Sequence, residues 1–577
     1  MKKLLKYLTH GYLKETILAP LFKCTEAVLE LFVPLVVADI IDTGIGNGDK
    51  DHVVLMCAVL VGLGALGLAF SITAQFFAAK AATGFSKTVG NALFRHIQTL
   101  SYSDLDEMGT STLMTRMTSD LTQVQTGVNM TLRLLLRSPF VVFGAMIMAF
   151  TIDVSSALIF AVTIPVLAAV VMGIMLAGLP LYGKVRAGLD RLLGRTRENL
   201  SGARVIRAFC IEDRETEKFA HENDSLTHVQ RTAGRISALM NPITFALINL
   251  AIIVLIRTGA LRVEAGLLTQ GQVVALYNYM SQILVELIKF ADLIITITKA
   301  AACGKRIQSA LDGGTGMEGG SEKDGRADSP YSVEFRGVCF RYGNAAENSL
   351  TGIDFRAEKG SVIGIIGGTG SGKTALVNLI PRFYDASDGE VLIDGRSVKE
   401  YDIEALRGKI GVVPQKAVLF AGTLRENMQW RDNNAADEEI LAALATAQAK
   451  DIIDKKENGL DCRVEQGGAN FSGGQRQRLT IARALVGAPE ILILDDSSSA
   501  LDFATDAALR SALRSLKDTT VFIVSQRTSS IMHADRIIVL DDGKAAGIGT
   551  HAELLESCDV YKEIYDSQFR KEGGESA

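Results

Sequence analysis

The sequence predicts a membrane protein of two domains: an all-α domain with six transmembrane helices, followed by an α/β domain built around a phosphate-binding loop. Two observations support this fold class. Of the 577 residues 48% are hydrophobic and the mean hydropathy is +0.22, but nearly all the long apolar runs lie in the N-terminal half. The C-terminal half has the composition of a soluble domain, and it contains a glycine-rich loop between a strand pattern and a helix pattern.

Six stretches of the N-terminal half are apolar enough to cross a bilayer, which requires about 20 residues of helix. They cover residues 17–41, 53–79, 134–152, 156–178, 237–260 and 273–298. Residues 1–16, which are basic and then apolar, predict an amphipathic elbow helix at the membrane surface. Carboxylates in the first span should face a helix bundle or a water-filled path rather than lipid. On the sixth span, Tyr277, Tyr279, Glu286 and Phe290 are candidates for lining a substrate pocket, and the alternative is that residues at this helical spacing pack within the bundle.

The basic residues predict the orientation in the membrane. Residues 182–236 are rich in lysine and arginine, whereas the connection 44–52 offers only Lys50 against two aspartates. By the positive-inside rule, the long connections 80–133 and 182–236 face the cytoplasm. Both termini then face the cytoplasm as well, because the number of spans is even. The predicted location is the cytoplasmic membrane, with several passes through the lipid bilayer.

The two long connections have helical periodicity, so the membrane helices should continue into the cytoplasm and be joined in pairs by a short helix at the tip. After the last span, the segment DGGTGMEGGSEKDGRADSP (312–330) is rich in glycine and charge and predicts a flexible linker. Seven cysteines without a CxxC pair argue against a zinc site or a disulfide framework. The predicted organisation is an elbow helix (1–16), a transmembrane domain (17–307), a linker (308–331), a nucleotide-binding domain (332–569) and a disordered tail (570–577).

The segment SVIGIIGGTGSGKTALVNLI (361–380) contains Gly367-x-x-x-x-Gly372-Lys373-Thr374 in the strand–loop–helix context that a P-loop requires. In such a loop, backbone N–H groups and the helix N-terminus hold phosphate oxygens, Lys373 reaches the β and γ phosphates, and Thr374 binds Mg²⁺. The pattern predicts ATP and Mg²⁺ as cofactors. The predicted phosphate-binding residues are Gly367, Gly368, Thr369, Gly370, Ser371, Gly372, Lys373 and Thr374.

Further motifs follow in order, and with them the chain resembles the ATP-binding cassette (ABC) proteins, specifically exporter-type half-transporters, over nearly its whole length. The segment NFSGGQRQRLTIARAL (470–485) resembles the signature loop of that family, with the motif positions at Ser472, Gly473, Gly474 and Gln475. The resemblance implies the type I exporter fold, also called the type IV ABC fold, with a P-loop NTPase domain. It also implies that this loop faces the γ-phosphate held by the opposite subunit.

The resemblance assigns roles to four more residues. Asp495 matches the Walker B aspartate, and Gln415 of VVPQ matches the glutamine loop that senses Mg²⁺ and the membrane domain. Tyr342 of FRYG matches the aromatic residue that stacks on adenine, and Asp502 of SSALD matches a loop that contacts the other subunit. The implied ligands of Mg²⁺ are Thr374, Gln415 and Asp495.

Two positions depart from the family pattern, and both concern hydrolysis. The residue after Asp495 is Asp496, where family members competent for turnover have a glutamate that polarises the attacking water. The side chain is one methylene shorter, and a displacement on the order of an ångström can reduce a rate about a hundredfold. Gln526 of VSQRT replaces the histidine of the family's switch motif, so a group that can be cationic is lost there. These degenerate positions, Asp496 and Gln526, are the candidate catalytic residues.

These departures predict an obligate heterodimer. The pattern resembles an exporter of small amphipathic or xenobiotic compounds in which this chain's Walker site binds ATP but hydrolyses it poorly. A second half-transporter would complete the active site at Ser472–Gln475, and a homodimer is the less favoured arrangement. The alternatives are a non-transporting regulatory subunit, an importer of metal chelates with the same fold, and an exporter of lipids or peptides. No nucleic-acid partner is expected.

Overall fold

The computed structural model describes residues 2–314, 317, 319–326, 329–343 and 345–569. The chain divides into two compact units, one made of Met1–Gln98 and Ser111–Gly313 and the other of Thr99–Thr110 and Gly314–Ala577. Residues 99–110, which lie within the predicted transmembrane domain, therefore cluster with the second unit. The predicted disordered tail, 570–577, lies outside the described residues, and so do residues 315–316, 318 and 327–328 of the predicted linker.

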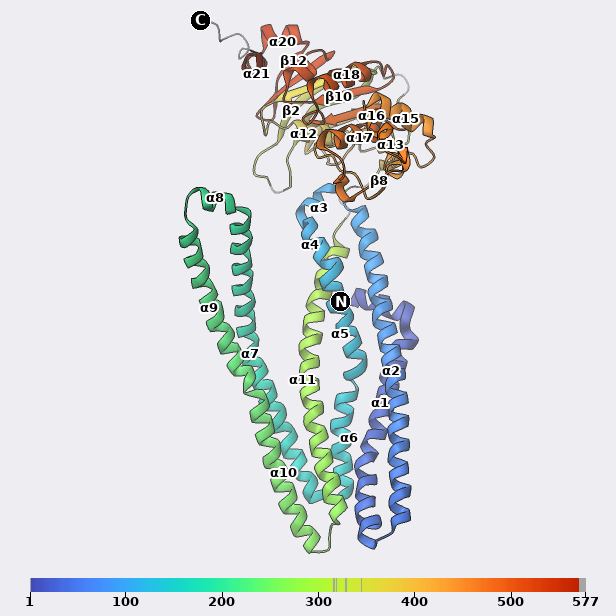
Figure 1. Ribbon diagram of the computed structural model, residues 1–577, viewed down its shortest axis with the longest axis vertical. Coiled ribbons are helices and arrows are strands. Elements are labelled where there is room, and N and C mark those ends of the chain that lie inside the picture. Colours follow the sequence, from blue (N-terminus) through green and yellow to red (C-terminus); the bar gives the residue numbers. More distant parts are fainter. Residues whose placement is uncertain (1, 315–316, 318, 327–328, 344, 570–577) are drawn as a thin grey trace. The chain divides into compact units, whose positions relative to one another are not determined.

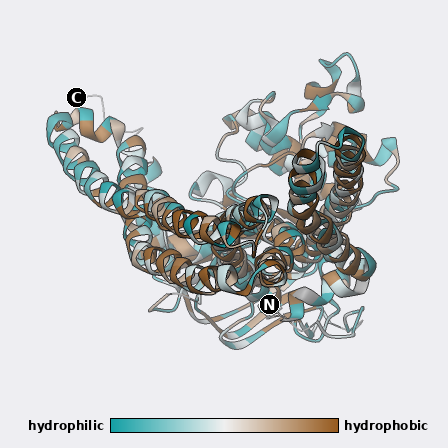
Figure 2. Ribbon diagram, turned by 90° about the horizontal axis from the view of Figure 1, so that it is seen from below, coloured by the Kyte–Doolittle hydropathy of each residue, from teal (hydrophilic) through white to brown (hydrophobic). Residues whose placement is uncertain are grey.

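The first unit consists of long helices and several short ones (Figure 1), and Figure 2 shows hydrophobic stretches along the long helices. In chain order they are α1 (Lys2–Asp39), the π-helix η1 (Ile40–Ile45), α2 (Lys50–Thr99), α4 (Thr110–Thr115), the π-helix η2 (Arg116–Asp120), α5 (Leu121–Leu134), α6 (Arg137–Ile152), α7 (Val154–Ser201), α8 (Ala203–Ala208), α9 (Glu212–Ala238), α10 (Met240–Glu264) and α11 (Gln270–Asp312). α1 has a non-helical residue at Tyr12, inside the predicted elbow helix.

Within the described residues, four helical stretches are long and apolar enough to cross a membrane: Lys50–Thr99, Thr110–Ile152, Val154–Ser201 and Glu212–Glu264. The most apolar part of α2 is not buried at all, as expected for a helix that faces lipid. The first and sixth predicted spans lie in α1 and α11, which are not among these four. Both segments carry charged residues, Lys23, Glu26 and Glu30 in α1 and Glu286, Lys289 and Asp292 in α11.

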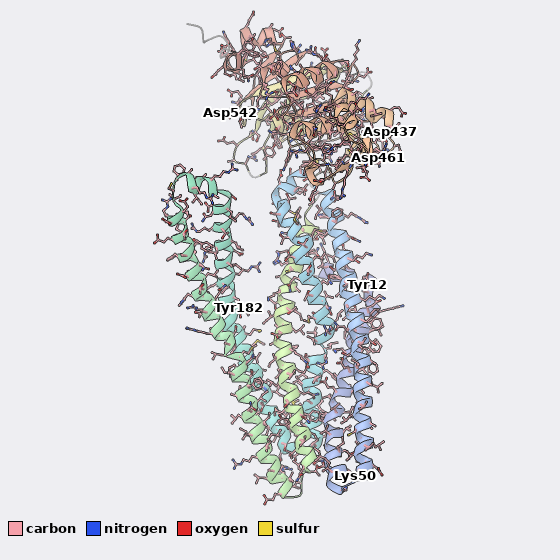
Figure 3. The ribbon with its side chains drawn as sticks, viewed as in Figure 1. Tyr12, Lys50, Tyr182, Asp437, Asp461 and Asp542 are labelled. Atoms are coloured by element: carbon pink, nitrogen blue, oxygen red, sulfur yellow. The ribbon has the colours of Figure 1, made fainter. Side chains whose placement is uncertain are left out.

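The helices are connected as predicted, by tight turns and by a short helix at a tip. Only Asp153 separates α6 from α7, and its carboxylate accepts the N–H of Ser156 at 2.8 Å, which caps α7. α8 joins α7 to α9, and these two helices form an antiparallel pair that extends away from α11 (Figure 1). The hydroxyl of Tyr182 on α7 lies 2.7 Å from that of Ser237 on α9, which ties the pair together (Figure 3).

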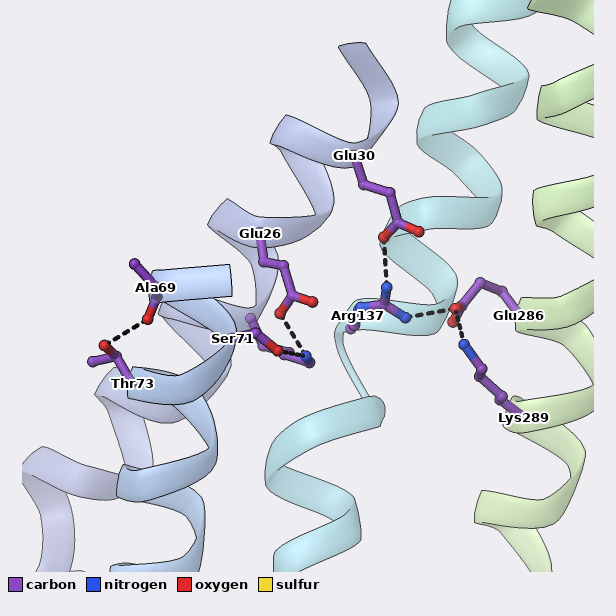
Figure 4. A network of polar contacts seen from close by, with 9 residues as sticks. Glu26, Glu30, Ala69, Ser71, Thr73, Arg137, Glu286 and Lys289 are labelled. Carbon is purple, nitrogen blue, oxygen red and sulfur yellow. Dashed lines mark hydrogen bonds and ion pairs between the residues drawn. The ribbon is translucent and has the colours of Figure 1, made fainter. Parts of the chain in front are cut away.

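A buried ion-pair network holds α1, α6 and α11 together (Figure 4). Arg137 begins α6 directly after the break that follows α5, and its guanidinium donates to Glu286 of α11 at 2.5 Å and to Glu30 of α1 at 2.6 Å. Ser138 and Lys289 also donate to Glu286, at 2.8 and 3.0 Å. The side chains of Arg137 and Glu286 are only 8% and 3% exposed. The charges of the sixth span are therefore compensated inside the bundle.

Two of the candidate pocket residues consequently have structural roles. Glu286 is held by Arg137, Ser138 and Lys289. Tyr279 is fully buried, and its hydroxyl donates to the carbonyl of Leu31 at 2.6 Å. The prediction that these two line a substrate pocket is wrong, because buried polar groups in a bundle need each other as partners. Tyr277, at 43% exposed, is not buried in this way.

Replacing Arg137 with glutamine should destabilise the first unit, because Glu286 would be left buried without its main counter-charge. Breaking a buried pair from one side costs roughly 3–5 kcal/mol. The double variant R137Q/E286Q should lose less stability than the single variant R137Q, since no unpaired charge remains at position 286. Thermal unfolding of the chain in detergent measures the stability of both variants. The exposed pair Lys3–Asp312 is the control, because its loss in K3A should change stability by about 1 kcal/mol or less.

The second unit begins with α3 (Tyr102–Met108) and continues as an α/β domain from residue 331. Its strands are β1 (Tyr331–Phe340), β2 (Leu350–Glu358), β3 (Val362–Gly367), β4 (Asp388–Ile393), β5 (Arg396–Ser397), β6 (Ile410–Val413), β7 (Gly422–Thr423), β8 (Arg463–Val464), β9 (Ile491–Asp495), β10 (Thr520–Val524), β11 (Arg536–Asp541) and β12 (Lys544–Gly549). Its other helices are α12 (Lys373–Leu379), α13 (Ile403–Lys409), α14 (Leu424–Met428), α15 (Asp437–Thr446), α16 (Lys450–Asp454), η3 (Gly459–Asp461), η4 (Gln466–Gly468), α17 (Gly473–Leu485), α18 (Phe503–Arg514), α19 (Thr528–Ile531), α20 (His551–Ser557) and α21 (Asp559–Phe569).

The strands form a central six-stranded sheet in the order β12-β11-β3-β10-β9-β6, an antiparallel sheet in the order β2-β1-β4-β5, and the pair β7-β8. In the central sheet β11, β3, β10, β9 and β6 are parallel, and only β12 runs the other way. β9 and β10 are buried along their whole length, which explains their continuous apolar sequences. The carboxyl ends of β3, β10, β9 and β6 therefore lie side by side, where ligands of such sheets bind.

The segment predicted as a flexible linker is partly ordered in the structure. α11 continues to Asp312, so residues 308–312 of that segment are helical. Further along, the N–H of Gly320 donates to the carbonyl of Tyr401 at 2.9 Å. The N–H of Arg326 donates to the carbonyl of Asp394 at 2.8 Å. Residues 320–326 of this segment are therefore attached to the antiparallel sheet region of the second unit.

Candidate functional site

The P-loop connects β3 to α12 and folds around the side chain of Lys373. The ammonium donates to the carbonyls of Gly367 and Gly368 at 2.9 and 2.6 Å, and it lies 3.4 Å from the hydroxyl of Ser371. Gly372 has a φ of 95° and stands at the N-cap of α12, where a side chain would also collide with the carbonyl of Ser349. Only glycine fits there, and the loop can present its backbone N–H groups at the start of the helix.

Burial lowers the pKa of the Lys373 ammonium from its ordinary value, against the opposing effect of the carboxylates of Asp496 and Asp495. Burial is also the main reason why the pKa of Asp495 is raised, and the charge of Asp496 adds to it. The site therefore contains a poorly solvated cation next to a poorly solvated carboxylate. An anion near Lys373 and a cation near Asp495 would each favour the charged form of that group.

Three oxygen-bearing side chains fit the magnesium ion that the resemblance implies. Thr374 donates its hydroxyl to Asp495 at 3.2 Å, so the two groups meet at the start of α12 and the end of β9. Gln415 follows β6, the neighbour of β9 in the sheet. Hydroxyl, carboxylate and amide oxygens are the ligands that Mg²⁺ prefers, and the ion usually keeps waters and substrate phosphates as its other ligands.

The two degenerate positions lie at the same edge of the sheet. Asp496 follows Asp495 with a φ of 45°, a left-handed conformation that is uncommon outside glycine and occurs at functional sites. Its carboxylate accepts a long hydrogen bond from the amide of Gln415 at 3.5 Å, and its backbone N–H donates to Val524. Gln526 comes shortly after β10, which separates β9 from β3 in the sheet.

A cavity of about 310 Å³ brings these residues together. From the predicted set it is lined by Tyr342, Thr369, Gly370, Gly372, Lys373, Thr374, Gln415, Asp495, Asp496 and Gln526. Gly367, Gly368 and Ser371 of the predicted set are not part of the lining, but each is hydrogen-bonded to the Lys373 ammonium. The sequence contains no signal for four further lining residues: Ala375 in α12, and Ser349, Val524 and Ser525 at the ends of strands.

The signature residues are absent from that lining. Ser472 caps α17: its hydroxyl accepts the N–H of Gln475 at 3.3 Å, and Gln475 accepts the N–H of Ser472 at 2.9 Å. Both Ser472 and Gly473 are exposed, so the N-terminus of this helix faces outward from its own domain. Asp502 caps α18 in the same manner through Thr505, and those hydrogen bonds lower the pKa of its carboxyl.

Comparison with known proteins identifies the family. Residues 16–287 match the family model described as the ABC transporter transmembrane region, and residues 350–499 match the model described as ABC transporter. The chain is also 37% identical over 561 residues to the uncharacterized ABC transporter ATP-binding protein YfiB of Bacillus subtilis, covering 97% of each chain. The chain belongs to the ABC transporter family.

Other relatives of this ABC transporter include the uncharacterized ABC transporter ATP-binding protein Rv1273c of Mycobacterium tuberculosis, 36% identical over 560 residues and 95% of each chain. The ATP-dependent lipid A-core flippase of Desulfotalea psychrophila is 32% identical over 487 residues, covering 82% of this chain and 83% of the flippase. Among solved structures, a bacterial Atm1-family ABC exporter with ATP bound superposes with a TM-score of 0.79 at 23% identity, covering 96% of this chain and 99% of the exporter.

These findings confirm the predicted family and fold class. This ABC transporter has a helical transmembrane domain followed by an α/β ATPase domain, in the half-transporter arrangement of an exporter, and it spans the membrane several times. The likeness to the Atm1-family exporter concerns the fold alone. The roles of the individual site residues remain predictions.

Proposed function

We propose that this ABC transporter is one half of a heterodimeric exporter that uses ATP to extrude amphipathic compounds. In this proposal its own Walker site binds MgATP and hydrolyses it slowly. The observation that carries the proposal is the composition of the nucleotide cavity. Groups suited to binding phosphate and Mg²⁺, among them Lys373, Thr374 and Asp495, share the cavity with Asp496 and Gln526, which replace the family's glutamate and histidine.

Each hydrolytic site of such a pair would be completed by a signature loop from the other chain. The outward-facing N-terminus of α17 supports this, because its free N–H groups and helix dipole suit an anion bound by a partner. A homodimer would contain two sites with Asp496 and Gln526. A heterodimer would contain one such site and one in which the partner provides a glutamate and a histidine opposite Ser472–Gln475.

The tip of the long helix pair provides further support for a partner chain. On and next to α8, Val205 and Phe209 are 58% and 73% exposed. Large apolar side chains at the end of a solvated helix pair are typical of a docking surface. We propose that this tip docks on the ATPase domain of the partner subunit and that both lie in the cytoplasm, with the two termini on the same side.

For the transported compound, the proposal favours amphipathic molecules of the xenobiotic type. A second candidate is a lipid, and the specific observation in its favour is the likeness to an enzyme described as an ATP-dependent lipid A-core flippase. Both candidates have an apolar part and a polar part, so one transport assay can compare them.

The decisive measurement is ATP turnover of the purified chain alone and together with the half-transporter encoded beside it. We expect slow turnover alone and an increase of at least tenfold in the pair, because a well-placed catalytic base contributes about 10²–10⁴-fold. ATP-dependent uptake into inside-out vesicles, with a dye and with a labelled lipid, then compares the substrates and would exclude a purely regulatory subunit. Rapid turnover by the homodimer would contradict the proposal.

A further inference from the structure

A continuous series of aromatic contacts leads from Tyr342 to α3. The ring of Tyr384, in the turn after α12, meets the ring of Tyr342 edge-on with centroids 5.2 Å apart. On its other side the same ring lies 6.1 Å from the ring of Tyr102, the first residue of α3, and Phe383 lies 4.6 Å from Tyr102. Both distances are within the range of attractive aromatic pairs. All these residues belong to the second unit.

Tyr384 is also attached to α3 by a polar bond. Its hydroxyl donates to the carboxylate of Asp106 at 2.7 Å. Burial and this carboxylate both raise the pKa of Tyr384, so the hydroxyl stays a proton donor at neutral pH. A ring that served only to fill space would need no hydroxyl directed at a charged group of another element. Tyr384 thus touches the adenine-side tyrosine with its ring and α3 with its hydroxyl.

The turn that presents Tyr384 is held in place from behind. Arg407 of α13 stacks on the ring of Phe383 at 5.3 Å, and its guanidinium donates to the carbonyls of Pro381 and Arg382 at 3.2 and 3.0 Å. The ring of Tyr342 also meets Phe340 at 4.7 Å, and Phe340 lies 5.5 Å from Tyr384, so the direct contact and the contact through Phe340 both lead to the Tyr384 side chain. The series of contacts is therefore a defined physical connection between two sites.

We propose that Tyr384 is a positioning residue that links adenine binding at Tyr342 to the docking of α3. In this proposal, adenine stacked on Tyr342 restricts the motion of the Tyr342 ring. That ring in turn restricts the Tyr384 ring, so the Tyr384 hydroxyl keeps its hydrogen bond to Asp106. By linkage, the docking of α3 raises the affinity for adenine by the same factor. In chain order α3 lies between α2 and α4. This inference rests on the placement of adenine at Tyr342 in the proposed function.

The test compares Y384F, which keeps the ring and loses the hydroxyl, with the unchanged full-length protein in lipid nanodiscs. We expect Y384F to weaken MgATP binding about fivefold, the scale of one net hydrogen bond. Binding of magnesium tripolyphosphate, which has no base, should not change. MgATP should also slow hydrogen exchange at the amides of α3 in the unchanged protein, and this protection should be lost in Y384F.

Three further variants sharpen the result. D106A should behave like Y384F, whereas D106N keeps an acceptor oxygen and should retain most of the protection. Y401F is the matched control, because the buried hydroxyl of Tyr401 donates to the carbonyl of Ile393 at 2.9 Å, within the antiparallel sheet region. Y401F loses a comparable hydrogen bond that does not involve α3, so MgATP should still slow hydrogen exchange at the amides of α3 in this variant.

Equal weakening of MgATP and tripolyphosphate binding in Y384F would overturn the proposal, since a purely structural defect affects both. Persistence of MgATP protection at α3 in Y384F would overturn it as well. Failure of the proposed function can be distinguished from failure of this inference. The heterodimer is tested by ATP turnover with the partner, and the placement of adenine is tested by Y342A. If Y342A leaves MgATP binding unchanged, adenine does not stack on Tyr342 and the proposed role of Tyr384 is wrong.

Discussion

Replacing Ser472 with alanine should reduce ATP turnover of the assembled pair by about a hundredfold, although Ser472 lies outside this chain's own nucleotide cavity. The hydroxyl of Ser472 caps α17, whose N-terminus faces outward. If that helix end completes the partner's site, its loss removes preorganised stabilisation of the γ-phosphate at the one site that turns over rapidly. Removing a single donor of this kind typically costs 10²–10³-fold in rate.

The control for S472A is a second helix with the same cap. Thr550 caps α20 through an equivalent exchange with Glu553, at 3.4 and 2.8 Å. T550A should lower stability by about 1 kcal/mol, as loss of an N-cap usually does, and leave turnover unchanged. Steady-state turnover and thermal unfolding of both variants, each paired with the wild-type partner, separate catalysis from folding. If S472A and T550A affect turnover equally, the proposed division between the two sites is wrong.

The double variant D496E/Q526H should restore hydrolysis at this chain's own site. Lengthening Asp496 by one methylene moves the carboxylate on the order of an ångström toward an attacking water, and a histidine can add charge stabilisation at the γ-phosphate. Misplacement of that size costs about a hundredfold, so a gain of similar size is expected. This gain in turnover is measured in a pair that also carries S472A. S472A slows hydrolysis at the partner's site, so the partner's turnover does not hide the gain at this chain's own site.

Asp542 provides a matched control for this variant. It has a φ of 44°, close to the 45° of Asp496, and it is exposed and does not line the nucleotide cavity (Figure 3). D542E therefore lengthens an aspartate of the same backbone conformation outside the cavity, and it should not change turnover. Turnover in the D496E/Q526H pair that stays at the S472A level would mean that another feature of the site limits hydrolysis.

Hydropathy and motif spacing are local patterns, and they predicted a helical membrane domain followed by an α/β ATPase domain. Hydropathy locates helices such as α2, and the spacing Gly367 to Thr374 locates a loop whose geometry its glycines require. The sequence could not reveal which partners the charged residues of the spans have. Glu286 looked like a pocket residue until the structure placed Arg137 beside it.

The same limit applies to Tyr384. It belongs to no motif, and its partners Asp106 and Tyr342 lie far from it along the chain, so no periodicity or spacing could connect them. The cavity residues Ser349 and Ser525 were missed for the same reason. Ser525 reaches the site because the parallel strands end at one edge of the central sheet, and Ser349 reaches it from the start of β2 in the antiparallel sheet.

The sequence by itself therefore determined the family, the fold class and the chemistry available to the ATPase domain, including the substitutions Asp496 and Gln526. These follow from covalent neighbours, whose spacing sets hydropathy, loop geometry and motif. Only the tertiary structure decided which charges neutralise each other in the bundle, that α17 directs its N-terminus outward, and that Tyr384 joins Tyr342 to α3. Such contacts depend on the packing of segments that lie far apart in the sequence, and local sequence patterns do not determine the free energy of that packing.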